Sequence, residues 1–591
     1  MLSAIKRRFG RLTEAFVRFP VTVLLLAAAA VMTAMTINGH ETLGRFIMTC
    51  AVGAAAIAAG QVLYERFFAG RLWRLIMAAA GLALALLFFI SVRTLPENSP
   101  ALLVRPAVTM FALFIAFVWV GVIKSRYGFD ESFMAAFKAL IQAIFFSGVI
   151  FLGCVAIIAA VDTLITPVHE DAFAHTANIA FIVVAPLILL SLIPIYPGRS
   201  TKGVSDDNQA ALIEKRTGSP RFLDVLLSYI IVPLTAVFTV ILLIYILLNI
   251  GGSLWTDNLL EPMLIAYSIT VIIVTLLVSR LENKPADLFR RIFPKVLIPI
   301  AVFQVIASTL LLTDTGITYG RYYVILYGVF TVFSGVVLSL KPARKSGIIA
   351  LALVILSAVS LIPPTDAFSV SRNSQISALE TVLGKNGMLQ SGMVKPDGSI
   401  PDEDKARIVA SISYLTETQA LDAVAWLPPE FSGYDSAAFY KTFGFDMYSP
   451  TLPGPTYVSL YTDRDGVIPV GGYDVLLHVS IPMTNTPGGM DIAFELNGEA
   501  YALIAGASGG DAALVVRDAD GREVIRFDTG EIFARYADYA ADQSLLTPEE
   551  ATFTEENENA AIKVIVQNAG FTKTPRIADK NAQVYMLINL K

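Results

Sequence analysis

The segment SGIIALALVILSAVSLIP, residues 346–363, divides the chain into two parts of different character. Before it, long apolar runs follow one another with short polar connections. After it, the sequence is acidic and typical of a water-soluble region. Over the 591 residues, 55% are hydrophobic and 16% are charged, whereas soluble globular proteins carry about 25% charged residues. Together with a mean hydropathy of +0.64, this composition predicts a polytopic membrane protein.

Apolar runs long enough to cross a bilayer recur throughout the first part of the chain. A helix needs roughly 20 apolar residues to span a hydrocarbon core of about 30 Å. The sequence therefore predicts an α-helical membrane bundle with about eleven spans. The predicted spans cover residues 20–37, 45–63, 73–92, 105–123, 138–162, 176–196, 222–250, 260–279, 294–313, 321–340 and 346–363.

The distribution of Lys and Arg predicts the orientation, because basic residues are retained on the cytoplasmic side during insertion. With the N-terminus inside, 24 basic residues fall in cytoplasmic segments and 4 in outer connections. An odd number of spans then places everything after Pro363 outside the cytoplasm. The four outer basic residues are Arg45, Arg93, Arg105 and Arg321.

The two parts also differ in net charge. Residues 1–363 carry 28 Lys and Arg against 18 Asp and Glu, and residues 364–591 carry 16 against 31. The net charges are therefore +10 and −15. A basic inner face suits membrane lipids with anionic headgroups, whereas an acidic outer domain is a poor partner for nucleic acid.

We predict three domains from these patterns. Directly after the last span, apolar residues recur at helical spacing, and Asn386-Gly387 is a helix-end signal. After Met447 the period changes to two, which predicts an α+β domain with an antiparallel sheet or sandwich. The domains are the transmembrane helices at 1–363, an extracytoplasmic helical subdomain at 364–446 and an extracytoplasmic β-rich domain at 447–591.

The connection VDTLITPVHEDAFAHTAN, residues 161–178, is the most polar of the short outer ones. His169, Asp171 and His175 are candidate ligands for a divalent metal or a proton. Their spacing matches no strong metal-binding motif, and a solvated loop in front of the next helix has the same composition. Both interpretations stay open, and the sequence points to no particular cofactor.

Two short patterns lie on either side of the last span. Residues 316–323 read Gly-x-Thr-x-x-Arg-Tyr-Tyr, and residues 368–375 read Phe-Ser-Val-Ser-x-x-Ser-Gln. With the sequence around them, from residue 10 to 430, they are similar to a family of bacterial membrane proteins catalogued only as domain of unknown function 4153. The resemblance implies a bacterial membrane location and no reaction.

These patterns bring candidate binding residues to the outer ends of the last two spans. Arg321 stands there among Tyr319, Tyr322 and Tyr323. An arginine in that position can bind a phosphate or carboxylate ligand bidentately, beside tyrosines suited to the membrane interface or to stacking on sugars. Alternatively, Arg321 fixes the outer domain to the membrane part by bonding to a carboxylate such as Asp366.

We find no catalytic constellation. Gly506 to Gly510 match the Gly-x-Ser-x-Gly pattern, but a strand rather than a helix is predicted to follow, so a turn explains them. The favoured function is a non-enzymatic binding, scaffold or sensor protein of the inner membrane, with lipids and an envelope glycan, lipid or protein as partners. The alternative is a transferase for lipid-linked glycans, or a lipid or solute transporter, with its site at the outer membrane face.

Overall fold

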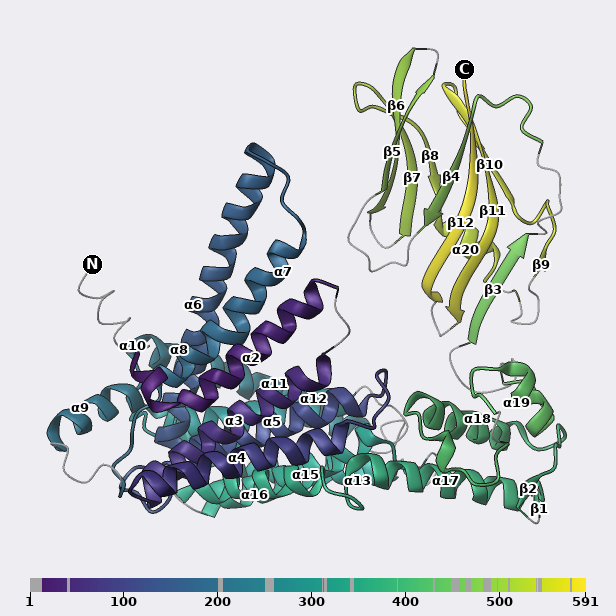
Figure 1. The fold of residues 1–591 in the computed structure, drawn as a ribbon. Helices are drawn as coiled ribbons and strands as arrows, with labels where there is room; N and C mark the ends of the chain where they lie inside the picture. Colours follow the sequence, from purple (N-terminus) through teal and green to yellow (C-terminus); the bar gives the residue numbers. More distant parts are fainter. Residues whose placement is uncertain are drawn as a thin grey trace. The chain divides into compact units, whose positions relative to one another are not determined.

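The fold of the chain comes from a computed structural model, shown in Figure 1. It describes residues 13–591 apart from gaps at 40–42, 200–205, 250–259, 311, 313–315, 341–344, 391, 429–430, 448–455, 463–468, 482–489, 497, 509–510, 538, 540–544 and 574–576.

The chain forms two compact units. The first comprises Met1–Thr381 and Ser411–Ala425, and the second Val382–Ala410 and Trp426–Lys591. The division between them falls inside two helices that follow the last apolar segment. Compactness does not mark where a chain leaves the membrane, so the predicted domain boundaries at residues 363 and 446 stay predictions.

Helices make up the first unit up to residue 359. Their bounds are α2 (Pro20–Ile37), α3 (Gly44–Phe67), α4 (Arg71–Val92), α5 (Ala101–Val120), α6 (Phe129–Leu164), α7 (Asp171–Asn178), the π-helix η1 (Ile179–Val184), α8 (Ala185–Leu192), α9 (Asp206–Thr217), α10 (Arg221–Val225), the π-helix η2 (Leu226–Ile231), α11 (Val232–Asn249), α12 (Leu260–Leu277), α13 (Lys284–Leu310), α15 (Tyr319–Leu340) and α16 (Gly347–Val359).

Among the described residues, nine helices are long and apolar enough to cross a membrane. Two of them include a π-helical turn, at Asp171–Leu192 and Ala210–Leu248, and the second range also contains the break between α9 and α10. The apolar helices Glu261–Leu277 and Gly347–Val359 are shorter. Every predicted span therefore contains a helix, and the chain is a multi-pass membrane protein. The two short helices leave the predicted count of about eleven spans unconfirmed.

The membrane helices pack around a common apolar core. It contains Phe117 of α5, Leu297 of α13, Phe330 of α15 and Ile349 of α16, all at most 6% exposed. In Figure 1 α13 and α15 run side by side, and these two helices share an extensive contact. Many other apolar side chains stay exposed, as a surface in contact with lipid requires.

Three helices follow the last apolar segment, as predicted. They are α17 (Ala367–Lys385), α18 (Asp402–Glu417) and α19 (Ser436–Phe443), with a two-stranded ribbon of β1 (Leu389–Gln390) and β2 (Met393–Val394) after α17. Gly387, at the predicted helix end, has a φ of +66°, a backbone conformation that glycine adopts without steric cost. The helix-end signal in the sequence is therefore confirmed.

Two sheets form the β-rich region, and the prediction of antiparallel strands there is confirmed. One sheet has the order β4-β12-β11-β3-β9, with β10 also paired to β11, and the other is a meander, β5-β6-β7-β8. All pairs are antiparallel except β3 with β9. The strands are β3 (Thr456–Thr462), β4 (Val475–Ile481), β5 (Met490–Leu496), β6 (Glu499–Ser508), β7 (Asp511–Asp518), β8 (Glu523–Asp528), β9 (Leu545–Leu546), β10 (Thr552–Glu556), β11 (Ala560–Lys573) and β12 (Ile577–Leu590).

The two sheets share one hydrophobic core and so form a sandwich. Alternate residues of the central strands face it, such as Ile562 and Val564 of β11 and Met586 of β12, each at most 1% exposed. Val516 of β7 belongs to the same core from the other sheet. The short helix α20 (Gly530–Arg535) adds the buried Phe533. Alternation with period two therefore buries one face of each sheet.

Candidate functional site

Asp366 lies at the point where the chain passes from the last apolar helix to α17, and its side chain is fully buried. One carboxylate oxygen, Oδ1, accepts hydrogen bonds from the backbone N–H groups of Phe368 and Ser369, both at 3.2 Å. Asp366 is therefore the N-cap of α17, because such a residue satisfies the unpaired N–H groups of the first helical turn.

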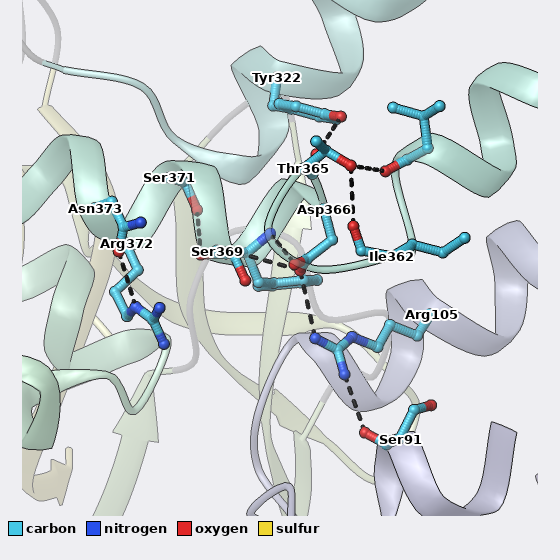
Figure 2. Close-up of polar contacts among 12 residues, drawn as sticks. Ser91, Arg105, Tyr322, Ile362, Thr365, Asp366, Ser369, Ser371, Arg372 and Asn373 are labelled. Carbon is cyan, nitrogen blue, oxygen red and sulfur yellow. Dashed lines mark hydrogen bonds and ion pairs between the residues drawn. The ribbon is translucent and has the colours of Figure 1, made fainter. Parts of the chain in front are cut away.

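Arg105 provides the ion-pair partner of this carboxylate, as Figure 2 shows. Its Nη2 lies 3.4 Å from Oδ1 of Asp366, and its Nη1 donates to the carbonyl oxygen of Ser91 at 3.0 Å. The side chains of Arg105 and Asp366 are 14% and 1% exposed. The pair thus connects the start of α17 to α4 and α5 in a buried setting, where losing one partner leaves an uncompensated charge.

An aromatic cluster surrounds the ion pair. The ring of Phe368 stacks on Tyr319 at 5.1 Å between centroids, and the guanidinium of Arg105 lies 5.9 Å from the centre of the same ring. Tyr414 of α18 lies on the other side of Tyr319, at 6.2 Å. Burial raises the pKa of the Tyr414 hydroxyl above its usual value. Tyr414 therefore stays neutral and can accept a hydrogen bond.

The residues before α15 are held by α17 and α18. The N–H of Ile317 donates to Oγ of Ser374 at 2.9 Å, and Gln375 donates to the carbonyl oxygen of Ile317 at 3.3 Å. The N–H of Tyr319 donates to the Tyr414 hydroxyl at 2.8 Å. Backbone groups at a helix start need partners of this kind. Side chains distant in sequence therefore satisfy the start of α15.

Each residue of the Gly-x-Thr-x-x-Arg-Tyr-Tyr pattern for which a contact is resolved has a structural task. Gly316 has a φ of +70°, and a Cβ there would lie 3.0 Å from Nε2 of Gln375. The hydroxyl of Thr318 accepts from the N–H of Arg321 at 3.3 Å and so caps α15. The Tyr322 hydroxyl donates to the carbonyl oxygen of Thr365 at 2.7 Å (Figure 2), and Tyr323 packs edge-on against the ring of Tyr322.

The candidate residues at the outer ends of the last two spans therefore come together in one place, where Asp366 pairs with Arg105. Asp366, Tyr319 and Tyr322 all take part in the contacts described above. Arg321 lies half-buried on the first turn of α15, and the ion pair of Asp366 is formed with Arg105. Docking and ligand binding by Arg321 both stay predictions.

Sequence patterns alone do not identify Arg105 as a site residue. It was placed at the first position of the predicted span 105–123, where a basic residue needs no partner. In the structure α5 begins at Ala101, so Arg105 lies one turn inside an apolar helix. A charge inside an apolar helix usually has a partner, and this was the available signal.

The candidate metal ligands do not converge. Nδ1 of His169 lies 3.0 Å from Oδ2 of Asp171, whereas Nε2 of His175 lies 3.1 Å from Oδ1 of Asn38 on the end of α2. Within the described ranges of the chain, no three His, Cys, Asp or Glu side chains form a group that could hold a metal ion. The structure gives the metal site no support, and it stays a prediction.

The Gly-x-Ser-x-Gly match falls at the end of a strand. Ser508 is the last residue of β6 and pairs with Asp511, the first residue of β7. A strand follows, not the helix that a nucleophile of this type requires. A nucleophilic serine also needs a histidine, but Nε2 of His478, on β4, lies 3.0 Å from Oε1 of Gln567. The predicted strand after this segment is therefore confirmed, and the turn itself includes residues outside the described ones.

Comparison with known proteins gives a family and no activity. A family model described as "Domain of unknown function (DUF4153)" matches residues 21–388, which is more than half of the chain. The matched region begins at α2 and ends just after α17, so it contains both halves of the interface around Asp366. No curated protein and no solved structure matches the chain.

Proposed function

We propose that this chain, which belongs to the DUF4153 family, is a non-enzymatic binding, scaffold or sensor protein of the bacterial inner membrane. Its membrane helices hold a helical extension, and the β-rich part that follows is available to an envelope glycan, lipid or protein. The observation that carries this proposal is the interface around Asp366. There, the two family-like patterns bind each other through a backbone cap and stacked rings, beside the buried ion pair of Arg105 and Asp366.

This use of the two patterns supports docking over catalysis. Ser374, Gln375 and Tyr414 all bond to backbone groups at the start of α15, so their polar atoms serve to fix the chain. A catalytic site instead needs a nucleophile or general base that can approach a substrate. Residues that join two segments in this way hold α17 and α18 in a fixed position on the membrane helices.

The proposed topology has eleven spans, with the N-terminus in the cytoplasm and the β-rich part outside it. The excess of basic residues on one set of connections supports this orientation. The helix Gly347–Val359 is 13 residues long, which corresponds to about 20 Å at a rise of 1.5 Å per residue. The turns on either side complete the crossing in this proposal. The acidic charge of residues 364–591 keeps that region in water.

Photo-crosslinking in cells tests the binding role. Tyr461 and Leu545 are register partners on neighbouring strands, and their side chains are 45% and 61% exposed. A photoreactive residue in place of Leu545 should give a discrete product with an envelope component. The same residue at Glu499, which is exposed on the other sheet, should give a different pattern. If neither position gives a product and the purified protein transfers or transports a lipid-linked sugar in liposomes, the alternative function is correct.

A further inference from the structure

A second polar site lies far along the chain from the Asp366 interface, beside the first residues of α2. It is a cavity of about 570 Å³ lined by residues that directly precede α2 and by residues of α3, α4, α8 and α9. Three arginines line it, Arg18, Arg74 and Arg216, against one acidic residue, Glu14. The remaining polar side chains in its wall are Thr13, Gln61 and Ser191.

Arg18 forms the base of this cavity. Its Nε and Nη2 donate to the two carboxylate oxygens of Glu65 at 2.9 and 2.8 Å, and its Nη1 donates to the carbonyl oxygen of Ile193 at 2.8 Å. Gln61 donates to the same carboxylate at 3.0 Å. Glu65 therefore compensates the charge of Arg18, and together with Glu14 it sets two carboxylates against the three arginines at this site.

Arg74 is oriented by neutral groups. Its Nε donates to Oε1 of Gln61 at 3.1 Å, and its Nη2 donates to the carbonyl oxygens of Val17 and Arg18 at 3.0 and 2.8 Å. Within the described part of the chain, its Nη1 forms no hydrogen bond. Nη1 of Arg216, also in the lining, donates to the carbonyl oxygen of Leu192 at 2.6 Å. The guanidinium groups are thus pre-positioned, which reduces the entropy lost when they bind an anion.

An apolar cavity of about 260 Å³ continues from this polar one and shares Leu190 with it. It follows α2 from Thr22 to Leu26 and α3 from Ala58 back to Ala51. The hydroxyl of Thr22 is bonded to the carbonyl oxygen of Ala54 at 3.3 Å, so it leaves no unpaired polar group there. The π-helix η1 contributes Phe181, and such turns often occur at functional sites.

We propose that these two cavities together bind one anionic phospholipid. The phosphodiester accepts hydrogen bonds from Arg74, Arg216 and the remaining N–H groups of Arg18, because arginine matches the geometry of a phosphate. One acyl chain enters the alanine-lined cavity, which small residues keep open. The eight steps along the chain from Arg18 to Leu26, most of them in α2, correspond to about 12 Å at the helical rise of 1.5 Å per residue, enough for a glycerol backbone and the first part of a chain. A free phosphate would use the arginines and leave the apolar cavity empty.

Native mass spectrometry of the full-length protein in detergent tests this site. The lipids are phosphatidylglycerol and phosphatidylcholine with identical acyl chains, and glycerol phosphate serves as the free anion. Arg74→Gln should weaken phosphatidylglycerol binding about fivefold, which is about 1 kcal/mol per basic residue near an anionic headgroup. Arg71→Gln is the matched control, because Arg71 lies one turn earlier on α4, is exposed and does not line either cavity. The Arg71→Gln variant should bind phosphatidylglycerol as tightly as the unchanged protein does.

The apolar half of the site has its own variant. Ala55 lines the apolar cavity and is half-buried, so Ala55→Leu should fill the cavity and weaken binding of both phospholipids without affecting glycerol phosphate. The proposal is overturned if phosphatidylcholine binds as tightly as phosphatidylglycerol, if glycerol phosphate displaces the lipid at equal concentration, or if Arg71→Gln reduces binding as much as Arg74→Gln. The first two measurements use the unchanged protein and decide the question even where a variant does not fold.

Discussion

The buried side chains of Asp366 and Arg105 compensate each other's charge. The carboxylate caps α17 and pairs with a guanidinium that is itself bonded to the carbonyl oxygen of Ser91. One oxygen of Asp366, Oδ2, has no hydrogen-bond partner within the described structure. A buried ion pair of this kind contributes little net stability, yet removing one partner costs about 3 kcal/mol or more. The ion pair instead determines that α5 and the start of α17 pack together.

This argument predicts a strong coupling between the two residues. Asp366→Asn, which keeps the capping oxygen, should lower the protection of residues 368–375 from hydrogen exchange about 100-fold, equivalent to about 3 kcal/mol. Arg105→Leu should have a similar effect. The double variant should lose much less protection than the two single variants lose together, because no uncompensated charge remains in it. Additive losses would contradict the ion pair.

Asp404 gives a second prediction, in which pH is the variable. Its buried carboxylate accepts from Nζ of Lys385 at 2.9 Å and from Nδ2 of Asn386 at 3.0 Å. Burial raises the pKa of Asp404, but these hydrogen bonds and the charge of Lys385 outweigh burial, and the pKa is lowered overall. A lowered pKa stabilises the fold above the unfolded-state pKa of about 4, and this stabilisation disappears as the pH falls through the folded-state value.

Asp404→Asn should therefore lower the melting temperature at pH 7, with a cost of about 2 kcal/mol for lost hydrogen bonds to a charged group. The difference from the unchanged protein should shrink as the pH falls below about 4. Asp402→Asn is the control, since Asp402 is half-exposed and pairs with Lys405 three residues later on the surface of the helix. An Asp404→Asn difference that persists at pH 3 would show that the charge of Asp404 is not the cause.

At the scale of elements, the start of α15 depends on a glycine. Gly316→Ala should weaken the contact between α15 and α17, because a side chain at positive φ costs roughly 1–2 kcal/mol and Gln375 would have to move. Limited proteolysis near residue 316 should become faster. Gly320→Ala is the control, since a Cβ at Gly320, four residues later, meets no atom within 4 Å. Equal cleavage of both variants would exclude this explanation.

The elements themselves follow local patterns that the sequence displays. α17 ends at the predicted Asn386-Gly387 signal, and α19 ends at Gly444, which has a φ of +82°. The strands of the core sheets alternate more buried and more exposed residues, as β4 does from Val475 to Ile481. Boundaries inside the membrane part were less accurate, because an apolar run does not show where a helix continues into polar sequence. α6, at 36 residues, extends well beyond the predicted span 138–162.

At the scale of the whole molecule, the proposed topology can be tested with single cysteines. The only native cysteines, Cys50 and Cys154, lie in α3 and α6 and can be replaced by Ala. A membrane-impermeant maleimide added to intact spheroplasts should label Tyr434→Cys, whose parent side chain is 78% exposed. Glu282→Cys, in the exposed connection between α12 and α13, should react only after lysis. The reverse result would contradict the proposed orientation.

The sequence by itself determined that this is a multi-pass membrane protein with a β-rich C-terminal part, because apolar length and period are local properties. It also indicated the segments that meet near the last span. Only the tertiary structure decided that Arg105 pairs with Asp366, 261 residues away, and that Tyr414 and Ser374 cap the start of α15. Such pairings depend on which helix ends become neighbours in space, and no local period encodes that. The same reason explains why Arg18, which precedes α2, lines one cavity together with arginines of α4 and α9, next to an apolar cavity.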